Sequence, residues 1–425
     1  MKLGLLLYRF GTTLISPFAG WIFRRRAASG KEDQNRVNER LARTLPQRPA
    51  GDLIWLHGAS VGESLLQLQL AKQLIAGNQS LSLLMTCQTQ TGARRIVAEV
   101  ERVPILRDRN IIQQMAPIDT QSVARRFVQH WSPSGAVFAE SDIWPNLLMQ
   151  LQSQQIPVAL VSARLTERSL RGWSRWPKTA ETVLNTFDLI LASDKKTASG
   201  LSILAKRDVP CIGNLKTALP PPDADPAELS ELSAQIGERE VWVAASTHPG
   251  EEAIVLDALL QMSQRPFLIV APRHPERGDA VEGILTCSNL KVARRSQVET
   301  IPPDTDILLA DTMGEMGLWY RLADSVYLGG GHAPGVGGHN FLEPLRLGKP
   351  VITGPSLFNI EDLAQQLMGR DALTIVDDAA SLVSAYPGVP PSPSVLADLK
   401  GGQFGVMQQT VSELAQLFKG RGLEL

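Results

Sequence analysis

The sequence predicts an α/β protein of two domains, each built on a doubly wound parallel sheet. Short apolar runs alternate with longer amphipathic segments, and a proline-rich polar stretch at residues 219–227 interrupts that alternation. The length of 425 residues also exceeds what one hydrophobic core usually serves. We therefore expect an N-terminal domain over residues 27–218, a linker over 219–227 and a C-terminal domain over 228–425.

The expected strands are the short apolar runs, each followed by a segment with helical periodicity. In the N-terminal domain these runs are DLIWLHG, LSLLMTC, GAVFAE, IPVALVSAR and FDLILAS. In the C-terminal domain they are VWVAAST, FLIVAPR, ILLADT, SVYLGGG and PVITGP. Repeated strand–helix units of this kind imply a parallel sheet covered by helices. The last helical stretch, roughly residues 392–418, follows a second proline-rich loop, and the pattern leaves open which domain it packs on.

The composition is that of an ordinary folded protein, with 44% apolar and 20% charged residues. A formal net charge of -1 gives no support to nucleic-acid binding. Three cysteines, far apart in the chain, form neither a disulfide framework nor a zinc-binding spacing. We therefore expect a reducing compartment.

Residues 1–26 have the pattern of a membrane-surface anchor. The uncharged run Gly11 to Phe23 is shorter than the roughly 20 residues that a spanning helix needs. Trp21 is expected at the level of the lipid headgroups, and Arg24 to Arg26 are expected to meet anionic lipid. The alternative is a cleaved signal peptide, but basic residues rather than a small-residue cleavage site follow the apolar run.

Three charged residues of the N-terminal domain are candidates for catalysis. Ligands of open parallel sheets bind at the carboxyl ends of the strands, where HGASVGES places Glu63 and GAVFAE places Glu140. Glu63 suits either a general base or a carboxylate that complements the helix dipole, and its position alone does not separate the two. Lys216, in GNLKTA before the linker, is either a ligand-binding lysine or an ordinary surface one. Ser141 or Asp142 is expected to cap the helix that follows Glu140.

The C-terminal domain carries candidate anion ligands after its strands. His248, Arg273 and His274 follow two strands, and arginine beside neutral histidine suits a phosphate or carboxylate. The glycine-rich stretch GGGHAPGVGGHNFLEP at 329–344 is either a wide turn or a phosphate cradle. Asn340 is a good N-cap for the helix after it, and Glu343 falls in that helix's first turn, near enough to accept from ribose hydroxyls. The stretch matches neither a Walker A motif nor a dinucleotide fingerprint, so we expect a mononucleotide.

No metal site and no nucleophile motif is expected. Asp304 and Asp306 form a DxD pattern, but it precedes a strand and so lies at the wrong end of the sheet. The histidines lack HExxH spacing, and although GASVG at 58–62 fits the letters GxSxG, no nucleophile is expected.

Taken together, these motifs resemble those of the Kdo transferases of Gram-negative lipopolysaccharide synthesis, which transfer 3-deoxy-D-manno-octulosonic acid (Kdo). Single motifs are weak signals, whereas eight in the family's order are specific. The resemblance extends from the N-terminus to about residue 370. It rests on SVGE (60–63), ESDIWPN (140–146), SARL (162–165), GNLK (213–216), STHPGEE (246–252), PRHPER (272–277), DTMGE (311–315) and GGHNFLEP (337–344).

The resemblance implies a fold, a reaction and roles for individual residues. The family has the GT-B fold, in which two Rossmann-like domains face a cleft. Its members invert the anomeric configuration as they transfer Kdo from CMP-Kdo to the lipid A precursor, without a metal or other cofactor, at the cytoplasmic face of the inner membrane. Glu63 matches the proton acceptor, and Glu140 and Lys216 match positions that stabilise the transition state. The positions that match the CMP-binding segments are Pro272, Arg273, Met313, Gly314, Glu315, Asn340, Phe341, Leu342 and Glu343.

Some positions depart from the family pattern, and some roles stay open. Phe341 stands where the family commonly has proline, Asp142 stands where glutamate is usual, and Thr217-Ala218 after Lys216 is also unusual. Candidate contacts to the phosphates of the acceptor are Arg24 to Arg26, Arg36, Arg40 and Arg94. The alternative functions are another GT-B glycosyltransferase or a sugar-nucleotide epimerase, and a non-catalytic lipid- or nucleotide-binding protein.

Overall fold

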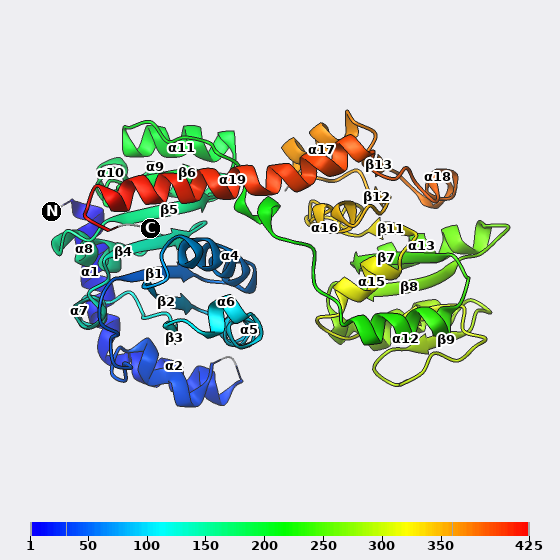
Figure 1. The fold of residues 1–425 in the computed structure, drawn as a ribbon, viewed down its shortest axis with the longest axis horizontal. Helices are drawn as coiled ribbons and strands as arrows, with labels where there is room; N and C mark the ends of the chain where they lie inside the picture. The colour runs from blue at the N-terminus through cyan, green and yellow to red at the C-terminus, as the bar shows by residue number, and fades with distance from the viewer. Residues whose placement is uncertain (1, 31, 359, 424–425) are drawn as a thin grey trace. The chain divides into compact units, whose positions relative to one another are not determined.

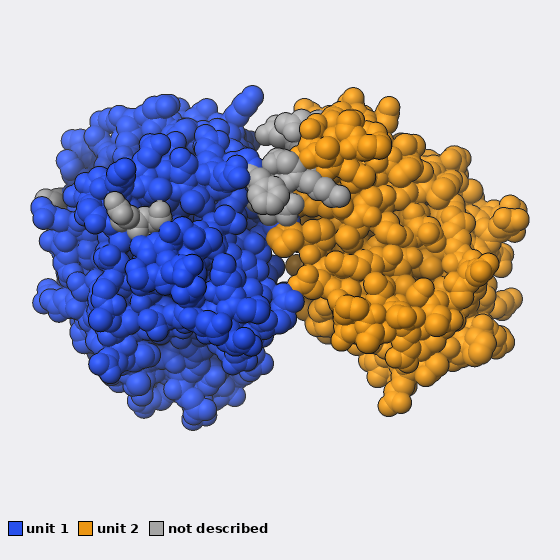
Figure 2. Space-filling model, viewed as in Figure 1, with its two compact units in different colours: residues 1–219, 403–425 blue, residues 220–402 orange. Residues whose placement is uncertain are grey.

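A computed structural model describes residues 2–30, 32–358 and 360–423, and the chain forms two compact units in it (Figure 1). Unit 1 comprises Met1–Leu219 and Gln403–Leu425, and unit 2 comprises Pro220–Gly402 (Figure 2). None of the helices in the described part of the chain combines the length and the hydropathy that a membrane span requires.

Unit 1 is a six-stranded, fully parallel sheet with helices on both faces. The strand order is β3-β2-β1-β4-β5-β6. The strands are β1 (Leu53–Gly58), β2 (Ser82–Cys87), β3 (Ile111–Met115), β4 (Gly135–Ala139), β5 (Val158–Ala163) and β6 (Leu189–Ala192). Its helices are α1 (Leu3–Ile15), α2 (Ala19–Ala28), α3 (Val37–Arg40), α4 (Val61–Gly77), α5 (Gln90–Arg102), α6 (Pro104–Arg107), α7 (Gln121–Trp131), α8 (Pro145–Ser153), α9 (Glu167–Ser174), α10 (Pro177–Leu184) and α11 (Lys195–Ala205). This order is that of a Rossmann-like sheet.

Alternate residues of each strand face opposite layers of unit 1. Ile54 and Leu56 of β1 pack with α4, α5 and the end of α19 (Pro393–Lys419). Leu53 and Trp55 pack with the layer that contains α7, α8, α10 and α11. Both faces of the sheet are therefore buried, which explains why its strands are continuous apolar runs.

Unit 2 is a second parallel sheet, with strand order β13-β12-β11-β7-β8-β10-β9. The strands are β7 (Val241–Thr247), β8 (Phe267–Pro272), β9 (Val292–Arg294), β10 (Ile307–Leu309), β11 (Ser325–Leu328), β12 (Val351–Thr353) and β13 (Thr374–Ile375). The helices are α12 (Pro226–Ile236), α13 (Glu251–Gln261), α14 (Gly278–Leu285), α15 (Met316–Leu322), α16 (Leu342–Arg346), α17 (Glu361–Met368), α18 (Ala379–Ala385) and the start of α19. The two expected doubly wound sheets are therefore both present.

The C-terminal boundary differs from the one that the sequence predicts. We expected residues 228–425 to form the second domain, but Gln403–Leu425 belongs to unit 1. Leu414 and Phe418 of α19 are fully buried in the core of that unit. The Phe418 ring lies so close to Gly135 at the start of β4 that an added Cβ there would be 2.3 Å from a ring carbon. This contact joins residues distant in sequence, which a local pattern does not reveal.

Helix α1 is docked on unit 1 by one face. The Tyr8 hydroxyl donates to Asp119 Oδ2 (2.8 Å), Arg9 donates to Gln121 (2.6 Å), and Leu5 is buried. The opposite face is apolar and exposed: Leu3, Leu7, Phe10, Leu14, Phe18 and Trp21 are each at least 53% exposed. Their spacing of three or four residues places them along one side of α1 and α2.

Candidate active site

The candidate catalytic residues of unit 1 lie at the carboxyl ends of β1 and β4. β1 pairs with β2 on one side and with β4 on the other, so the strand order changes direction between β1 and β4. In a doubly wound sheet this is the point at which ligands bind. Glu63 lies in the first turn of α4, directly after β1, and Glu140 directly follows β4.

Glu63 is almost buried and holds the turn between β1 and α4. Its side chain accepts hydrogen bonds from the Ala59 N–H (2.6 Å) and from the Ser60 hydroxyl (2.8 Å), and it is 7% exposed. Ser60 in turn caps α4 by accepting from the Glu63 N–H. The carboxylate therefore stabilises the start of the helix. Each of its oxygens has a second lone pair, which leaves capacity for a substrate proton.

Glu140 and Lys216 form an ion pair beside this turn. Glu140 has a φ of 56°, a left-handed conformation that costs a non-glycine residue on the order of 1–3 kcal/mol and is concentrated at functional sites. The Lys216 side chain lies over the first turn of α4, where a Cβ added to Gly62 would be 3.4 Å from Lys216 Cε. The structure thus brings Glu63, Glu140 and Lys216 together.

Asp142 and His57 are two further members of this cluster, and the sequence did not single them out as functional. Asp142 is 7% exposed, and its Oδ2 lies 3.6 Å from Nε2 of His57, which is 1% exposed. Burial, followed by the charge of Glu63, raises the pKa of Asp142 to about 8. Burial and the nearby Arg40 lower the pKa of His57 to about 3. Both shifts favour the neutral form of the group.

The side chain that caps α8 differs from the one that the sequence predicted. Neither Ser141 nor Asp142 caps this helix, because the helix begins at Pro145 after an uncapped Trp144. Instead Asp119, 6% exposed, accepts hydrogen bonds from the N–H groups of Asn146 (3.0 Å) and Leu147 (2.8 Å). The Asp142 carboxyl group is therefore not engaged in capping α8.

In unit 2 the buried carboxylate of Glu251 organises two loops at the carboxyl edge of the sheet. It is 1% exposed and accepts hydrogen bonds from the N–H groups of His248 (2.9 Å), Gly330 (2.8 Å) and His332 (3.0 Å). A Cβ at Gly329 would be 2.7 Å from Glu251 Oε2. Close approach to Ser246 O and Glu251 therefore explains the glycine at position 329.

Two histidines from these loops form a direct pair. Nε2 of His248 lies 2.8 Å from Nε2 of His339, and the two rings are stacked. Burial, His248 and Arg273 lower the pKa of His339 to about 4, and burial also lowers the pKa of His248. Both shifts favour the neutral rings, in which one Nε2–H donates to the other Nε2.

Arg273 is an exposed guanidinium beside this pair. It directly follows β8, and its own N–H donates to Thr247 O (3.0 Å). Its charge acts on Tyr320, His339 and Glu343, which places all three near it. Burial raises the pKa of Glu343, and Asn340 donates to Glu343 Oε1 (3.1 Å). A cation near neutral imidazoles and a carboxyl group can bind a phosphate and hydroxyl groups.

The helix after the glycine-rich stretch starts one residue later than predicted. Phe341, rather than Asn340, is the N-cap of α16, although Asn340 Oδ1 still accepts from the Leu342 N–H (3.2 Å). Phe341 and Leu342 are buried in the core of unit 2. Their side chains therefore do not reach a ligand, and only their backbone groups are available to one. Gly338 lies close to the side chains of Leu357 and Ile360.

The donor-binding residues predicted at 313–315 include an exposed side chain and one that bonds to other protein groups. Met313 is 76% exposed, and Gly314 has a φ of 94°. The Glu315 side chain accepts from Arg295 (2.9 Å) and from Thr312, so it is held against protein groups. Pro272 ends β8 and is buried. The structure places all these residues on the carboxyl side of the sheet of unit 2.

Three of the candidate acceptor-phosphate arginines already pair with acidic residues, and the first of them is Arg26, which pairs with Glu32 (3.4 Å). Arg40 is 5% exposed, pairs with Glu32 (3.0 Å) and donates to Ala116 O, so it is unavailable to a ligand. Arg36 donates to both oxygens of Glu39 (2.7 Å each). Arg24, Arg25 and Arg94 are exposed.

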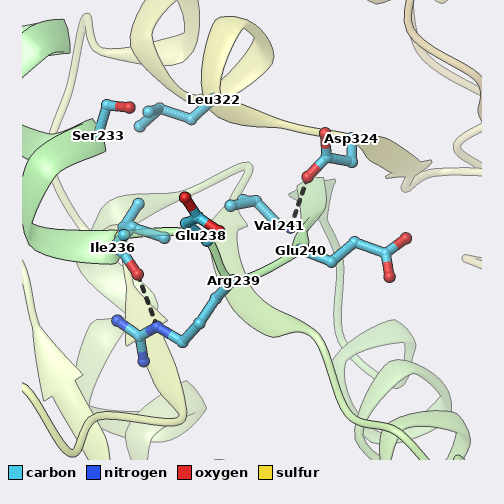
Figure 3. A pocket seen from close by; sticks show the side chains of 9 residues that line it. Ser233, Ile236, Glu238, Arg239, Glu240, Val241, Leu322 and Asp324 are labelled. Atoms are coloured by element: carbon cyan, nitrogen blue, oxygen red, sulfur yellow. Dashed lines mark hydrogen bonds between the residues drawn. The ribbon is translucent and has the colours of Figure 1, made fainter.

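A pocket of about 530 Å³ lies away from both candidate sites. Figure 3 shows its lining, which includes Glu238, Arg239 and Asp324, before the amino end of β7. Asp324 accepts from the Val241 N–H (2.8 Å), and Arg239 donates to Ile236 O (2.9 Å). These polar groups of the pocket therefore stabilise the loops at the amino ends of the strands. Ligands of parallel sheets bind at the carboxyl ends instead. The described residues contain no cluster of three or more His, Cys, Asp or Glu side chains placed to hold a metal ion.

Comparison with known proteins identifies the family. Residues 35–219 match a family model described as 3-deoxy-D-manno-octulosonic-acid transferase (kdotransferase). The 3-deoxy-D-manno-octulosonic acid transferase of Bordetella pertussis is 32% identical over 382 residues, which cover 86% of this chain and 87% of that protein. The chain belongs to the 3-deoxy-D-manno-octulosonic acid (Kdo) transferase family. It is therefore a glycosyltransferase.

A second relative agrees with that assignment. The enzyme of the same name from Haemophilus influenzae is 32% identical, over 77% of this chain and 76% of its own. A glycosyltransferase structure from Rickettsia africae is similar in fold, with a TM-score of 0.55 at 11% identity, and covers 88% of this chain and 99% of its own. A CMP-Kdo binding domain of WaaA from Acinetobacter baumannii is 34% identical over 45% of this chain and 96% of its own, with a TM-score of 0.36.

Proposed function

We propose that this Kdo transferase moves Kdo from CMP-Kdo to a hydroxyl of the lipid A precursor, with inversion and with Glu63 as general base. The observation that carries the proposal is the meeting of Glu63, Glu140 and Lys216 at the point where the sheet of unit 1 changes direction. A strained Glu140 backbone at the same point supports a functional rather than a structural role.

In the proposed reaction the acceptor hydroxyl attacks the anomeric carbon of Kdo. Its O–H bond breaks and the proton goes to Glu63, while the bond between the anomeric carbon and the phosphate oxygen breaks and its electron pair leaves with CMP. A single displacement of this kind needs one base and no protein nucleophile. The Glu140–Lys216 pair supplies fixed charges near the base, which stabilise charge as it shifts in the transition state.

In unit 2 we assign the donor to the carboxyl edge of the sheet. Arg273 is exposed there and offers a cation to the CMP phosphate, beside the His248–His339 pair. Glu343, held by Asn340, is the candidate acceptor for ribose hydroxyls. The leaving phosphate gains negative charge in the transition state, and a guanidinium stabilises that charge without a metal ion. We therefore propose a metal-independent transfer.

The exposed apolar face of α1 and α2 is proposed to lie on the cytoplasmic surface of the inner membrane. Phe10 and Trp21 are 66% and 62% exposed, and Arg24 and Arg25 at the end of α2 are exposed beside them. An apolar stripe followed by cations suits an anionic lipid surface, which is where a glycolipid acceptor resides.

Replacing Leu7, Phe10 and Leu14 by serine is expected to weaken binding to vesicles that contain anionic lipid by at least about 100-fold. Burying each such side chain stabilises by about 1.5–3 kcal/mol, and each 1.4 kcal/mol is a factor of ten in affinity. Co-sedimentation with phosphatidylglycerol vesicles measures the effect. Ile203→Ser is the matched control, because Ile203 is 76% exposed on α11. Equal binding by the triple variant and the control would remove α1 from the membrane contact.

The activity itself is tested by incubating the protein with labelled CMP-Kdo and lipid A precursor in the presence of EDTA. We expect label to become lipid-linked at the same rate with and without the chelator. Transfer that requires added metal would contradict the proposed mechanism. If label reached the lipid only when a different labelled nucleotide sugar replaced CMP-Kdo, another glycosyltransferase activity would be indicated.

A further inference from the structure

The loop that carries Met313 and Gly314 is held at both ends by residues from the end of one edge strand. It extends from Asp311 to Glu315, after β10, and β9 is the neighbour of β10 at the edge of the sheet of unit 2. Met313 and Gly314 are both exposed, so packing contributes little to fixing the middle of the loop. Its conformation therefore depends on how its two ends are held.

The first end is held through the carboxyl group of Asp311. Arg294 Nε donates to Asp311 Oδ2 (2.5 Å), and the N–H and hydroxyl groups of Ser296 donate to the same carboxyl group (3.0 and 2.6 Å). A Cβ added to Gly278 at the start of α14 would be 2.5 Å from Arg294 Nη2, so glycine there leaves room for the arginine. Three hydrogen bonds from residues 294–296 therefore fix this end of the loop.

The second end is held through the carboxylate of Glu315. Arg295 donates to Glu315 Oε1 from Nη2 (2.9 Å) and from Nε (3.2 Å), and the Thr312 hydroxyl donates to Oε2. The side chains of Arg295 and Glu315 are both mostly buried, where an ion pair is screened less than at the surface. The main-chain N–H of Arg295 donates to Leu309 O (2.9 Å), which attaches the arginine to β10. Arg295 is thus a cation held in place beside the loop.

Arg295 has a second acidic partner, Glu228 of α12. The side chain of Glu228 is 36% exposed, whereas that of Glu315 is 19% exposed, so Glu228 keeps more of its contact with water. A better solvated carboxylate loses less when its cation is removed. Replacing Arg295 by an uncharged residue would therefore affect Glu315 more than Glu228.

From these contacts we infer that Arg295 is a positioning residue for the donor. It fixes Glu315, and through it the segment with Met313 and Gly314, and it neutralises the Glu315 carboxylate. The inference rests on the proposed function, in which CMP-Kdo binds at this edge of the sheet of unit 2. The donor carries a phosphate and the Kdo carboxylate, so an unpaired Glu315 would repel it. Arg295 acts through Glu315 and does not itself contact the donor.

Arg295→Met is expected to weaken CMP binding by about tenfold. Methionine keeps an unbranched side chain but removes the charge and the donors. Titration calorimetry with CMP measures the affinity, and the urea midpoint of each variant shows that it is folded under the conditions of the titration. The KM for CMP-Kdo should rise by a similar factor while kcat falls by less than about threefold, because Arg295 acts on donor binding and not on Glu63. Unchanged affinity would overturn the inference.

A double-mutant cycle separates positioning through Glu315 from a general loss of structure. In the Glu315→Gln background, Arg295→Met should change the affinity for CMP by less than about twofold, because the carboxylate that Arg295 holds is already gone. The same loss in both backgrounds would show that Arg295 does not act through Glu315, and it would overturn the inference.

Two matched controls use the other contacts of this region. Lys291 lies just before β9, at the opposite edge of the sheet, and pairs with Asp304. Lys291→Met should bind CMP as the wild type does. Glu228→Gln removes the second partner of Arg295 and should also leave the affinity unchanged. A loss as large as that of Arg295→Met in either control would overturn the inference, and in Glu228→Gln it would assign Arg295 to holding α12.

The same titrations distinguish failure of the inference from failure of the proposed function. A wild type that transfers Kdo but binds CMP no better than Arg295→Met would overturn the inference alone. A wild type that neither binds CMP nor transfers Kdo would overturn the proposed function, and the inference with it.

Discussion

Glu63→Gln is expected to lower Kdo transfer by about 10²–10⁴-fold while leaving the affinity for CMP unchanged. Glutamine keeps an oxygen that accepts from the Ala59 N–H or the Ser60 hydroxyl, but it does not accept a proton from the acceptor hydroxyl. General base catalysis contributes on this scale. The rate is measured by transfer of label from CMP-Kdo to lipid, and the affinity by calorimetric titration with CMP.

Ser60→Ala provides the matched control for this substitution. It removes the hydroxyl that bonds to Glu63 and caps α4, at a cost of about 1 kcal/mol of stability, but it leaves the carboxylate in place. Transfer by Ser60→Ala should therefore exceed transfer by Glu63→Gln by at least tenfold, on the order of the base contribution. If Glu63→Gln retained wild-type transfer, Glu63 would be reassigned to holding the helix start.

Arg273→Ala is expected to weaken CMP binding by about 10–100-fold. Its guanidinium is exposed at the carboxyl end of β8, next to His339 and Glu343, and hydrogen bonds to charged groups contribute about 1.5–3 kcal/mol. Calorimetric titration with CMP measures the loss.

The control for Arg273 lies at the other end of the same strand, just outside it. Arg265 is exposed just before β8, at the opposite edge of the sheet, where no phosphate is expected. Arg265→Ala should bind CMP as the wild type does. Equal affinity in both variants would take Arg273 out of the phosphate site.

The two sheets could be predicted because most of their strands are buried on both faces and therefore form continuous apolar runs. β3 was missed, since its sequence, IIQQM, contains two glutamines. Gln114 is nevertheless fully buried, because its side-chain oxygen accepts from the Trp131 indole N–H (3.0 Å). β9 and β13 were also missed, because these two edge strands are only partly buried and form no continuous apolar run.

The candidate site could be predicted in part, by the rule that ligands bind at the ends of parallel strands. That rule and the motifs located Glu63, Glu140 and Arg273. They did not find His57, because its partners Trp55 and Thr86 become visible only when β1 and β2 pair. They also assigned Asp142 to a helix cap that Asp119 provides instead, through a contact 27 residues distant in sequence.

The most direct test of Kdo transfer with Glu63 as the base is mass spectrometry of lipid A precursor after incubation with CMP-Kdo. The wild type is expected to increase the lipid mass by whole Kdo residues, and Glu63→Gln, at the same protein and CMP-Kdo concentrations and over the same time, is expected to leave nearly all of the lipid unmodified. An unmodified lipid with the wild type, or the same mass increase with both proteins, would contradict the account.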